Sequence, residues 1–172
     1  MRAVCNAGPL IALGKVGQLG LLSRIFDEIL VAREVYREVV IDGRHVQAAE
    51  AHAVDFLVGE RIIQVVDVEI PSQSPLLNTG IDAGEVETIV LAQLEKVDWI
   101  LIDDKQARHN ARLAGLQIKG TVGLLLEAWR RDILSLQELE LLINQIKSLP
   151  ELWISEALCD AILTQARREI QS

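Results

Sequence analysis

The stretch Trp99-Ile100-Leu101-Ile102-Asp103-Asp104 decides how the rest of the sequence is interpreted. Four large apolar residues run directly into two carboxylates, with Asp98 before them. A short apolar run of this kind predicts a strand buried on both faces, as in a parallel sheet. The two acids then lie at its carboxyl end, where open α/β sheets bind their ligands. Either acid also fits as the N-cap of a helix that begins near Lys105. Whether they bind a ligand or cap the helix therefore depends on whether other acids of the chain lie at the same place.

Apolar runs alternate with helical patterns on both sides of this stretch. Short apolar runs predict strands at 3–5, 28–31, 61–68, 99–102 and 116–119. Helical spacing predicts helices at about 9–16, 19–26, 33–40, 47–58, 82–96, 105–113 and 121–129, with Thr121 as the cap of the last. Strands that alternate with helices predict an α/β fold with a mainly parallel sheet.

The end of the chain has a different character. Ser135 and Glu138 form a capping-box pattern ahead of an apolar helical stretch, and one more helix follows. We therefore predict that 134–172 is a C-terminal pair of helices packed on the same domain. Its apolar residues, Trp153 among them, need cover, which predicts a homodimer.

Composition limits the possible functions. The chain has 172 residues, half of them hydrophobic but only 3% aromatic, which predicts a single domain with an aliphatic core. A net charge of -8 argues against nucleic-acid binding through bulk charge, although a metal held by acids would supply local positive charge. Cys5 and Cys159 indicate no disulfide framework, which fits the reducing cytoplasm. The sequence has no uninterrupted apolar stretch of the kind found in signal peptides or membrane spans, so it predicts neither.

Other oxygen-bearing side chains are predicted at strand ends and helix starts. Asn6 ends the first strand, Asp82 and Glu85 open a helix, and Glu38 lies beside an apolar helix face. Mg²⁺ and Mn²⁺ prefer such oxygen ligands, and two ions can clamp the oxygens of a phosphodiester. Two alternatives stay open. Asp82 and Glu85 also match a capping box, and Glu38 also fits a solvated helix face.

Five motifs, in order, resemble those of PIN-domain proteins. They are Asn6-Ala7-Gly8-Pro9-Leu10-Ile11-Ala12-Leu13, Val35-Tyr36-Arg37-Glu38-Val39, Ala83-Gly84-Glu85-Val86-Glu87-Thr88-Ile89, Leu101-Ile102-Asp103-Asp104-Lys105-Gln106-Ala107-Arg108 and Gly120-Thr121-Val122-Gly123-Leu124-Leu125-Leu126-Glu127-Ala128. The last is similar to a prokaryotic branch of the family. Together the motifs predict a PIN-like domain over 1–133, and they leave the C-terminal helices unaccounted for.

The resemblance implies a three-layer α/β/α sandwich with a parallel sheet in the order 3-2-1-4-5. It also implies a Mg²⁺- or Mn²⁺-dependent endoribonuclease, a class that includes the toxins of toxin–antitoxin pairs. The partners it implies are an RNA substrate and an antitoxin protein. The matching catalytic positions are Asn6, Glu38, Glu85 and Asp103; the implied metal ligands are Glu38, Glu85 and Asp103, with Asp104 and Asp82 as second choices.

The sequence departs from the family at the first acidic position. The family usually has Asp there, whereas this chain has Asn6, which keeps an oxygen ligand but removes a negative charge. We therefore expect weaker metal binding. The alternative is a catalytically weak or inactive PIN-like module that binds RNA or a protein partner. A receiver-like signalling domain fits less well, because its acid pair follows the first strand rather than the fourth.

Three basic residues follow the acidic motif at helical spacing. Lys105, Arg108 and Arg112 lie at i, i+3 and i+7, which places them on one face of a helix. This arrangement predicts contacts with RNA phosphates beside the cut site. The alternative is an ordinary solvated helix face.

Overall fold

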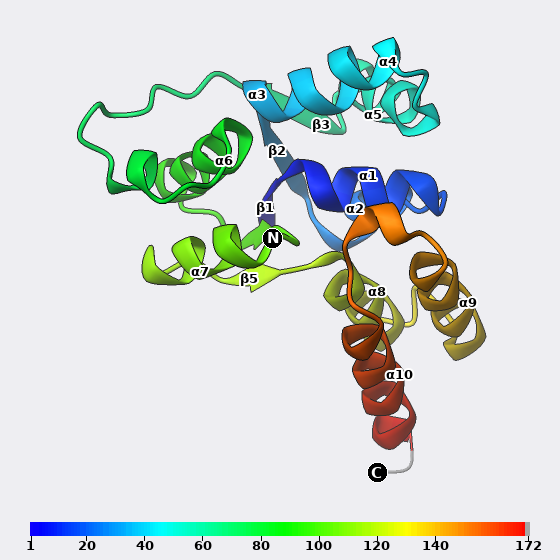
Figure 1. The fold of residues 1–172 in the computed structure, drawn as a ribbon. Coiled ribbons are helices and arrows are strands. Elements are labelled where there is room, and N and C mark those ends of the chain that lie inside the picture. Colours follow the sequence, from blue (N-terminus) through cyan, green and yellow to red (C-terminus); the bar gives the residue numbers. More distant parts are fainter. Residues whose placement is uncertain (171–172) are drawn as a thin grey trace.

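A five-stranded sheet forms the centre of the molecule. The computed structural model describes residues 1–170. Its strands are β1 (Arg2–Cys5), β2 (Glu28–Ala32), β3 (Ile63–Val66), β4 (Trp99–Leu101) and β5 (Ile118–Lys119). They pair in the order β3-β2-β1-β4-β5, and every pair is parallel (Figure 1). The predicted strand order is therefore confirmed.

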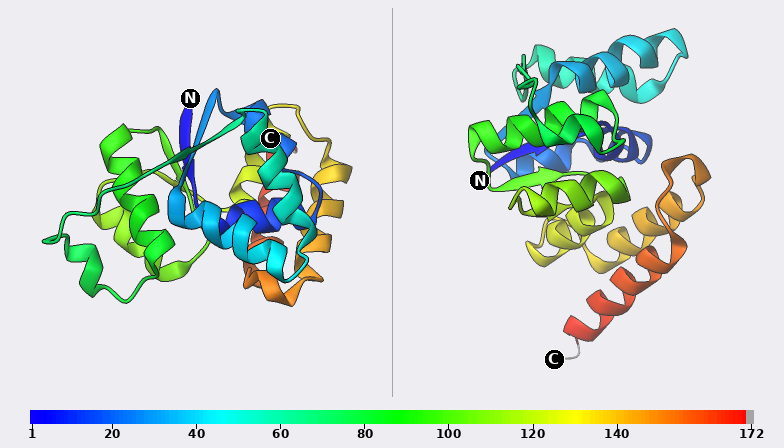
Figure 2. Two further views of the ribbon diagram at one scale, coloured as in Figure 1. Left: turned by 90° about the horizontal axis from the view of Figure 1, so that it is seen from above. Right: turned by 60° about the vertical axis from the view of Figure 1, so that its left-hand side comes forward.

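Helices cover both faces of this sheet. They are α1 (Ala7–Lys15), α2 (Gly20–Ile25), α3 (Arg33–Tyr36), α4 (Gly43–His45), α5 (Ala49–Gly59), α6 (Ala83–Glu95), α7 (Lys105–Leu113), α8 (Thr121–Arg130), α9 (Leu136–Lys147) and α10 (Glu156–Ile170). Shorter turns are the π-helix Arg37–Asp42 and the 3₁₀ helices Pro75–Asn78 and Pro150–Leu152. Figure 2 shows α6 and α7 on one side of the sheet and α1, α5 and α8 on the other. The α/β/α layers are as predicted.

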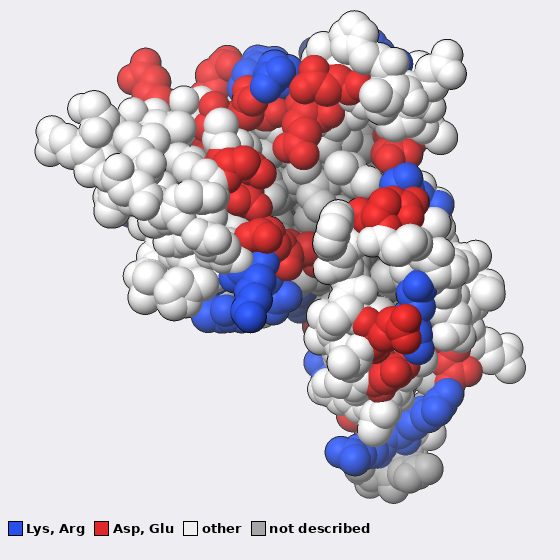
Figure 3. All heavy atoms as spheres, in the orientation of Figure 1, with Lys and Arg blue, Asp and Glu red and all other residues white. Residues whose placement is uncertain are grey.

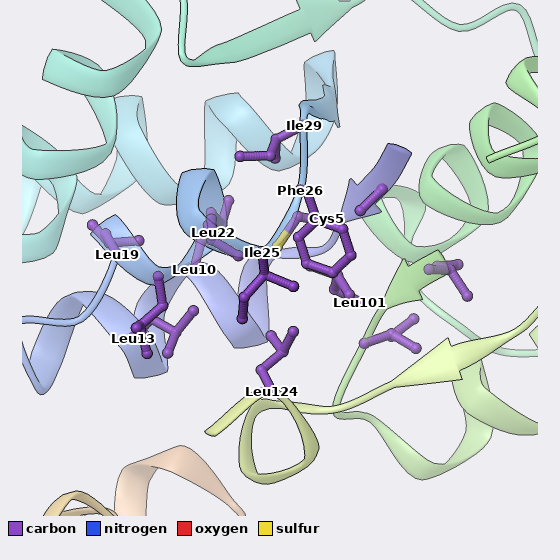
Figure 4. Close-up of a cluster of buried hydrophobic side chains, with 14 of the residues drawn as sticks. Cys5, Leu10, Leu13, Leu19, Leu22, Ile25, Phe26, Ile29, Leu101 and Leu124 are labelled. Carbon is purple, nitrogen blue, oxygen red and sulfur yellow. The ribbon is translucent and has the colours of Figure 1, made fainter. Parts of the chain in front are cut away.

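The core is aliphatic and continuous across the sheet. Val4, Ile100 and Leu101 have no exposed surface, because helices lie on both sides of their strands. Figure 4 shows Leu10, Leu22, Phe26 and others closing one side of the sheet over Cys5 and Leu101. Burial on both faces explains why these strands are apolar throughout and do not alternate.

The register of the two central strands positions the functional edge. Cys5 pairs with Leu101, so β1 and β4 end side by side. The backbone N–H of Asn6 then donates to the carbonyl of Leu101 at 2.9 Å. The chain leaves β1 into α1 on one face and leaves β4 into α7 on the other. This divergence is the topological switch point at which α/β sheets bind ligands.

The C-terminal helices pack against α8 and against each other (Figure 1). The Ser135 hydroxyl accepts the N–H of Glu138 at 3.2 Å, and the Glu138 carboxylate accepts the N–H of Ser135 at 2.7 Å. This confirms the predicted capping box at the start of α9. Among residues 1–170, no helix is long and apolar enough to cross a lipid bilayer.

One helix differs from its prediction. The helix expected at 33–40 continues to His45 and contains a π-helical turn at Arg37–Asp42. A π turn inserts an extra residue, which shifts the side chains that follow relative to the α-helical period. Val39 and Val40 are both buried, while Glu38 stays accessible.

Candidate active site

Asp103 is held at the end of β4 by the first residue of α8. The backbone N–H of Thr121 donates to Asp103 Oδ1 at 2.8 Å, and the Thr121 hydroxyl donates to Oδ2 at 2.5 Å. The prediction that Thr121 caps α8 is therefore wrong. Gly120 is the N-cap, and the Thr121 hydroxyl is committed to Asp103 instead.

Burial raises the pKa of Asp103, while the two bonds from Thr121 and the positive charge of Arg108 oppose this rise. Gly120 adds a steric constraint, because a Cβ at this position would lie 2.7 Å from Asp103 Oδ1. Real Cβ atoms do not approach an oxygen so closely, so the carboxylate position depends on glycine here.

Asn6 lies at the neighbouring strand end and is only 6% exposed. It occupies the N-cap position of α1 but makes no capping hydrogen bond with its side chain. The Thr88 hydroxyl donates to the Gly84 carbonyl at 2.6 Å and also lies 3.1 Å from Asn6 Oδ1. The end of β1 is thereby linked to the first turns of α6.

Asp82 and Glu85 form the capping box that their spacing predicts. Asp82 Oδ1 accepts the N–H of Glu85 at 2.8 Å, and Glu85 Oε2 accepts the N–H of Asp82 at 3.1 Å. Burial raises the pKa of Glu85 to about 7, and the charges of Asp82, Asp104 and Glu38 add to the rise. A structural role and an unusual ionisation therefore coexist at this residue.

Glu38 reaches the same place from the π-helical turn. Its Oε2 and Asp82 Oδ1 each lie 3.4 Å from where a Cβ on Gly84 would be, so the two carboxylates are close neighbours. Burial and the charges of Asp82 and Glu34 raise the pKa of Glu38. Glu38 is also exposed to solvent, as the alternative of a solvated helix face expects.

Asp104 caps α7 and points elsewhere. Its Oδ1 accepts the backbone N–H groups of Gln106 and Ala107, both at 2.8 Å, and the residue is exposed. Its charge still contributes to the raised pKa of Glu85. Helix capping is therefore its evident structural role.

The acids form two groups along one hollow. Glu38, Asp82 and Glu85 lie together at the start of α6, whereas Asp103 lies against α8. Figure 3 shows acidic side chains bordering this hollow and basic side chains below it over α7. Among residues 1–170, no three His, Cys, Asp or Glu side chains stand close enough to hold one metal ion.

The donor chemistry nevertheless fits a hard divalent cation. Carboxylate and amide oxygens are the ligands that such ions prefer, and a carboxylate oxygen with one hydrogen bond keeps a free lone pair. Burial is the main cause of the raised pKa values of Glu38, Glu85 and Asp103, and neighbouring carboxylates add to the rise at Glu38 and Glu85. A cation bound near them would lower these pKa values.

The predicted basic residues lie beside Asp103. Lys105, Arg108 and Arg112 line a cavity of about 450 Å³ together with Asp103 and part of the C-terminal segment. Lys105 and Arg112 are exposed and Arg108 is half-buried. The face is therefore accessible to solvent, and it also borders the acidic hollow.

A family model for the PIN domain matches residues 2–168 of the chain. The chain belongs to the PIN-domain family. PIN domains have a nuclease-type fold associated with RNA, and they generally depend on a divalent metal. The match continues past the recognised motifs and includes α9 and all but the last two residues of α10. No curated protein and no solved structure matches the chain.

Three residues of the site were not recognised as such from sequence. The sequence predicts a capping role for Thr121, no role for Thr88 and only a dimer contact for Trp153. The Gly120-Thr121 pair inside a family-like motif was the available signal for Thr121. Nothing local in the sequence connects Trp153 with Asp103, because the fold brings them to one cavity from 50 residues apart.

Proposed function

We propose that this PIN domain is a metal-dependent endoribonuclease that hydrolyses RNA phosphodiester bonds with Mg²⁺ or Mn²⁺. The observation that carries the proposal is the hollow at the ends of β1 and β4. There, Asp103 lines a cavity with Lys105, Arg108 and Arg112. Glu38 and Glu85, whose pKa values are raised like that of Asp103, lie at the start of α6.

Each side chain has a role in this proposal. Glu38 and Glu85 would hold metal on the α6 side and Asp103 would hold it on the α8 side, with Asp82 and Asp104 as further carboxylates. A bound divalent ion supplies a polarised water and positive charge at the phosphate.

Asn6 contributes a neutral oxygen ligand or orients the attacking water. Thr121 fixes Asp103, and the basic residues of α7 bind the flanking phosphates.

The test is RNA cleavage by purified protein with Mn²⁺ or Mg²⁺, and with EDTA as the metal-free control. We expect Asp103→Asn and Glu38→Gln to abolish cleavage. Glu60→Gln is the matched control, because Glu60 is an exposed acid that precedes β3 and so lies at the opposite end of the strands from the site. The proposed enzymatic activity would be contradicted if all variants cleaved RNA equally well, or if the wild type cleaved none.

The second candidate is a catalytically weak or inactive module, and Asn6 is the observation that favours it. Asn6→Asp restores the usual acid at this position. If the substitution creates Mn²⁺-dependent cleavage in an inactive protein, the wild-type site is only weakened. If metal still does not bind, the chain acts by binding RNA or a protein through the same hollow.

Two partners and a compartment complete the proposal. As a toxin, the enzyme would arrest growth when expressed alone, Asp103→Asn would not, and an antitoxin protein would neutralise it.

A homodimer would use the exposed apolar residues of the C-terminal helices, such as Leu158. The buried free thiols Cys5 and Cys159 fit the cytoplasm. Sedimentation of Leu158→Ser against wild type tests the dimer.

A further inference from the structure

Trp153 is the most exposed large apolar side chain among residues 1–170. Its side chain is 94% exposed, although tryptophan is normally well covered in folded proteins. Within the described part of the chain, its ring makes no hydrogen bond and no stacking or cation contact. Such exposure requires an explanation other than packing.

The backbone holds Trp153 in this outward position. Trp153 has φ +53°, a left-handed conformation that is uncommon for a bulky residue and energetically unfavourable. Its neighbours Leu152 and Ile154 both pack against the core. Lys15 pairs with Glu151 at 3.4 Å and fixes the same turn to α1. The indole ring is thus presented by a turn whose neighbouring residues are attached to the core and to α1.

The ring borders the cavity that contains Asp103 and the basic face of α7. Among the described residues, Lys105 and Arg112 form no ion pair, and Arg108 faces Asp103. Unpaired cations next to an exposed flat ring are complementary to a chain of phosphates that carries unstacked bases. A double helix lacks such bases, because they are paired and stacked inside it.

We propose that Trp153 is a stacking platform for one unpaired base of a single-stranded RNA, whose phosphates lie on Lys105, Arg108 and Arg112. The inference rests on the proposed ribonuclease function and adds a substrate-binding residue that lies outside the acidic motifs. The base that stacks on Trp153 flanks the phosphate beside Asp103. The segment that leads into α10, with Leu158 in the first turn of that helix, thereby supplies part of the substrate site.

The test is binding without cleavage, measured in EDTA at low salt by fluorescence anisotropy of a labelled oligouridylate and a labelled RNA duplex. We expect Trp153→Ala to weaken oligouridylate binding about 5- to 150-fold, the range found for loss of one aromatic stacking partner. Trp153→Phe keeps a ring and should retain most of the affinity. Duplex binding should not change with either variant.

Phe56→Ala is the matched control, because Phe56 is an aromatic residue of α5 that is 64% exposed and does not line the cavity. The inference is overturned if Trp153→Ala binds oligouridylate as well as wild type, or if wild type binds none. It is also overturned if Trp153→Ala changes only the sedimentation of the protein, because the ring then belongs to a contact between copies. Because this experiment measures binding in EDTA and not cleavage, an absence of cleavage in the test of the ribonuclease proposal can be told apart from an absence of stacking on Trp153.

Discussion

At the scale of single residues, Asp103 shows how the fold sets the charge of a buried acid. Burial disfavours the carboxylate, whereas the N–H and hydroxyl of Thr121 stabilise it. Both donors come from one residue at the start of α8. The ionisation of Asp103 therefore depends on a residue that lies 18 positions away in the sequence.

The first prediction concerns this hydroxyl. Thr121→Val removes a bond that lowers the pKa of Asp103, so that pKa rises and the ionised form requires a higher pH. If ionised Asp103 is needed for cleavage, the acid limb of the pH–rate profile moves to higher pH. Thr121→Ser retains the hydroxyl and should restore the wild-type profile. An unchanged profile in Thr121→Val would contradict the role given to Thr121.

The second prediction concerns Glu85 in metal-free protein. Its pKa rises from the usual 4.5 to about 7 on folding, so the folded state binds the proton more tightly than the unfolded state. This stabilisation is complete below about pH 4.5 and is lost as the pH rises to about 7. Urea unfolding in EDTA should therefore show the free energy of unfolding decreasing across this window.

Glu85→Gln should make that decrease shallower, because Gln does not ionise. Glu38 and Asp103 also have raised pKa values, so part of the decrease remains. Glu60→Gln, at the exposed end of α5, should keep the full pH dependence. A Glu85→Gln curve as steep as that of wild type would show that burial of this carboxyl has no energetic consequence.

At the scale of elements, the sequence was most informative where pattern and burial agree. The apolar run at 99–102 predicted β4 because both of its faces are covered, and the capping boxes predicted the starts of α6 and α9. The π turn at Arg37–Asp42 was not predictable, since an inserted residue leaves no change in composition. The contact between Asp103 and Thr121 requires the β4–β5 register, which no local pattern gives.

The third prediction tests whether α9 belongs to the core of the domain. Ile143 is fully buried, whereas Leu141 on the same helix is 59% exposed. Ile143→Ala should lower the free energy of unfolding by about 2–5 kcal/mol, because it removes buried methylene groups and leaves a cavity. Leu141→Ala should change it by less than about 0.5 kcal/mol. Both variants should unfold in one transition; a separate early transition for Ile143→Ala would indicate an independent C-terminal unit.

At the scale of the whole molecule, the charge near the candidate site differs in sign from the net charge of the chain. The chain carries a net charge of -8, yet Lys105, Arg108 and Arg112 form one basic cavity beside the acids. Figure 3 shows basic side chains gathered over α7, directly below the acidic side chains that border the hollow. The net charge repels a polyanion, whereas these three residues attract it, so we expect RNA binding to depend on few contacts.

The last prediction follows from that small number. Three phosphate contacts by a single strand give log affinity against log salt a slope of about -2, at about 0.7 per contact. Arg112→Gln should reduce the magnitude of the slope by about 0.7, since it removes one contact. Arg24→Gln, on the exposed surface of α2, should leave the slope unchanged. A much steeper wild-type slope would mean that RNA follows a longer path over the protein than the cavity beside Asp103, and an unchanged slope in Arg112→Gln would remove this residue from that path.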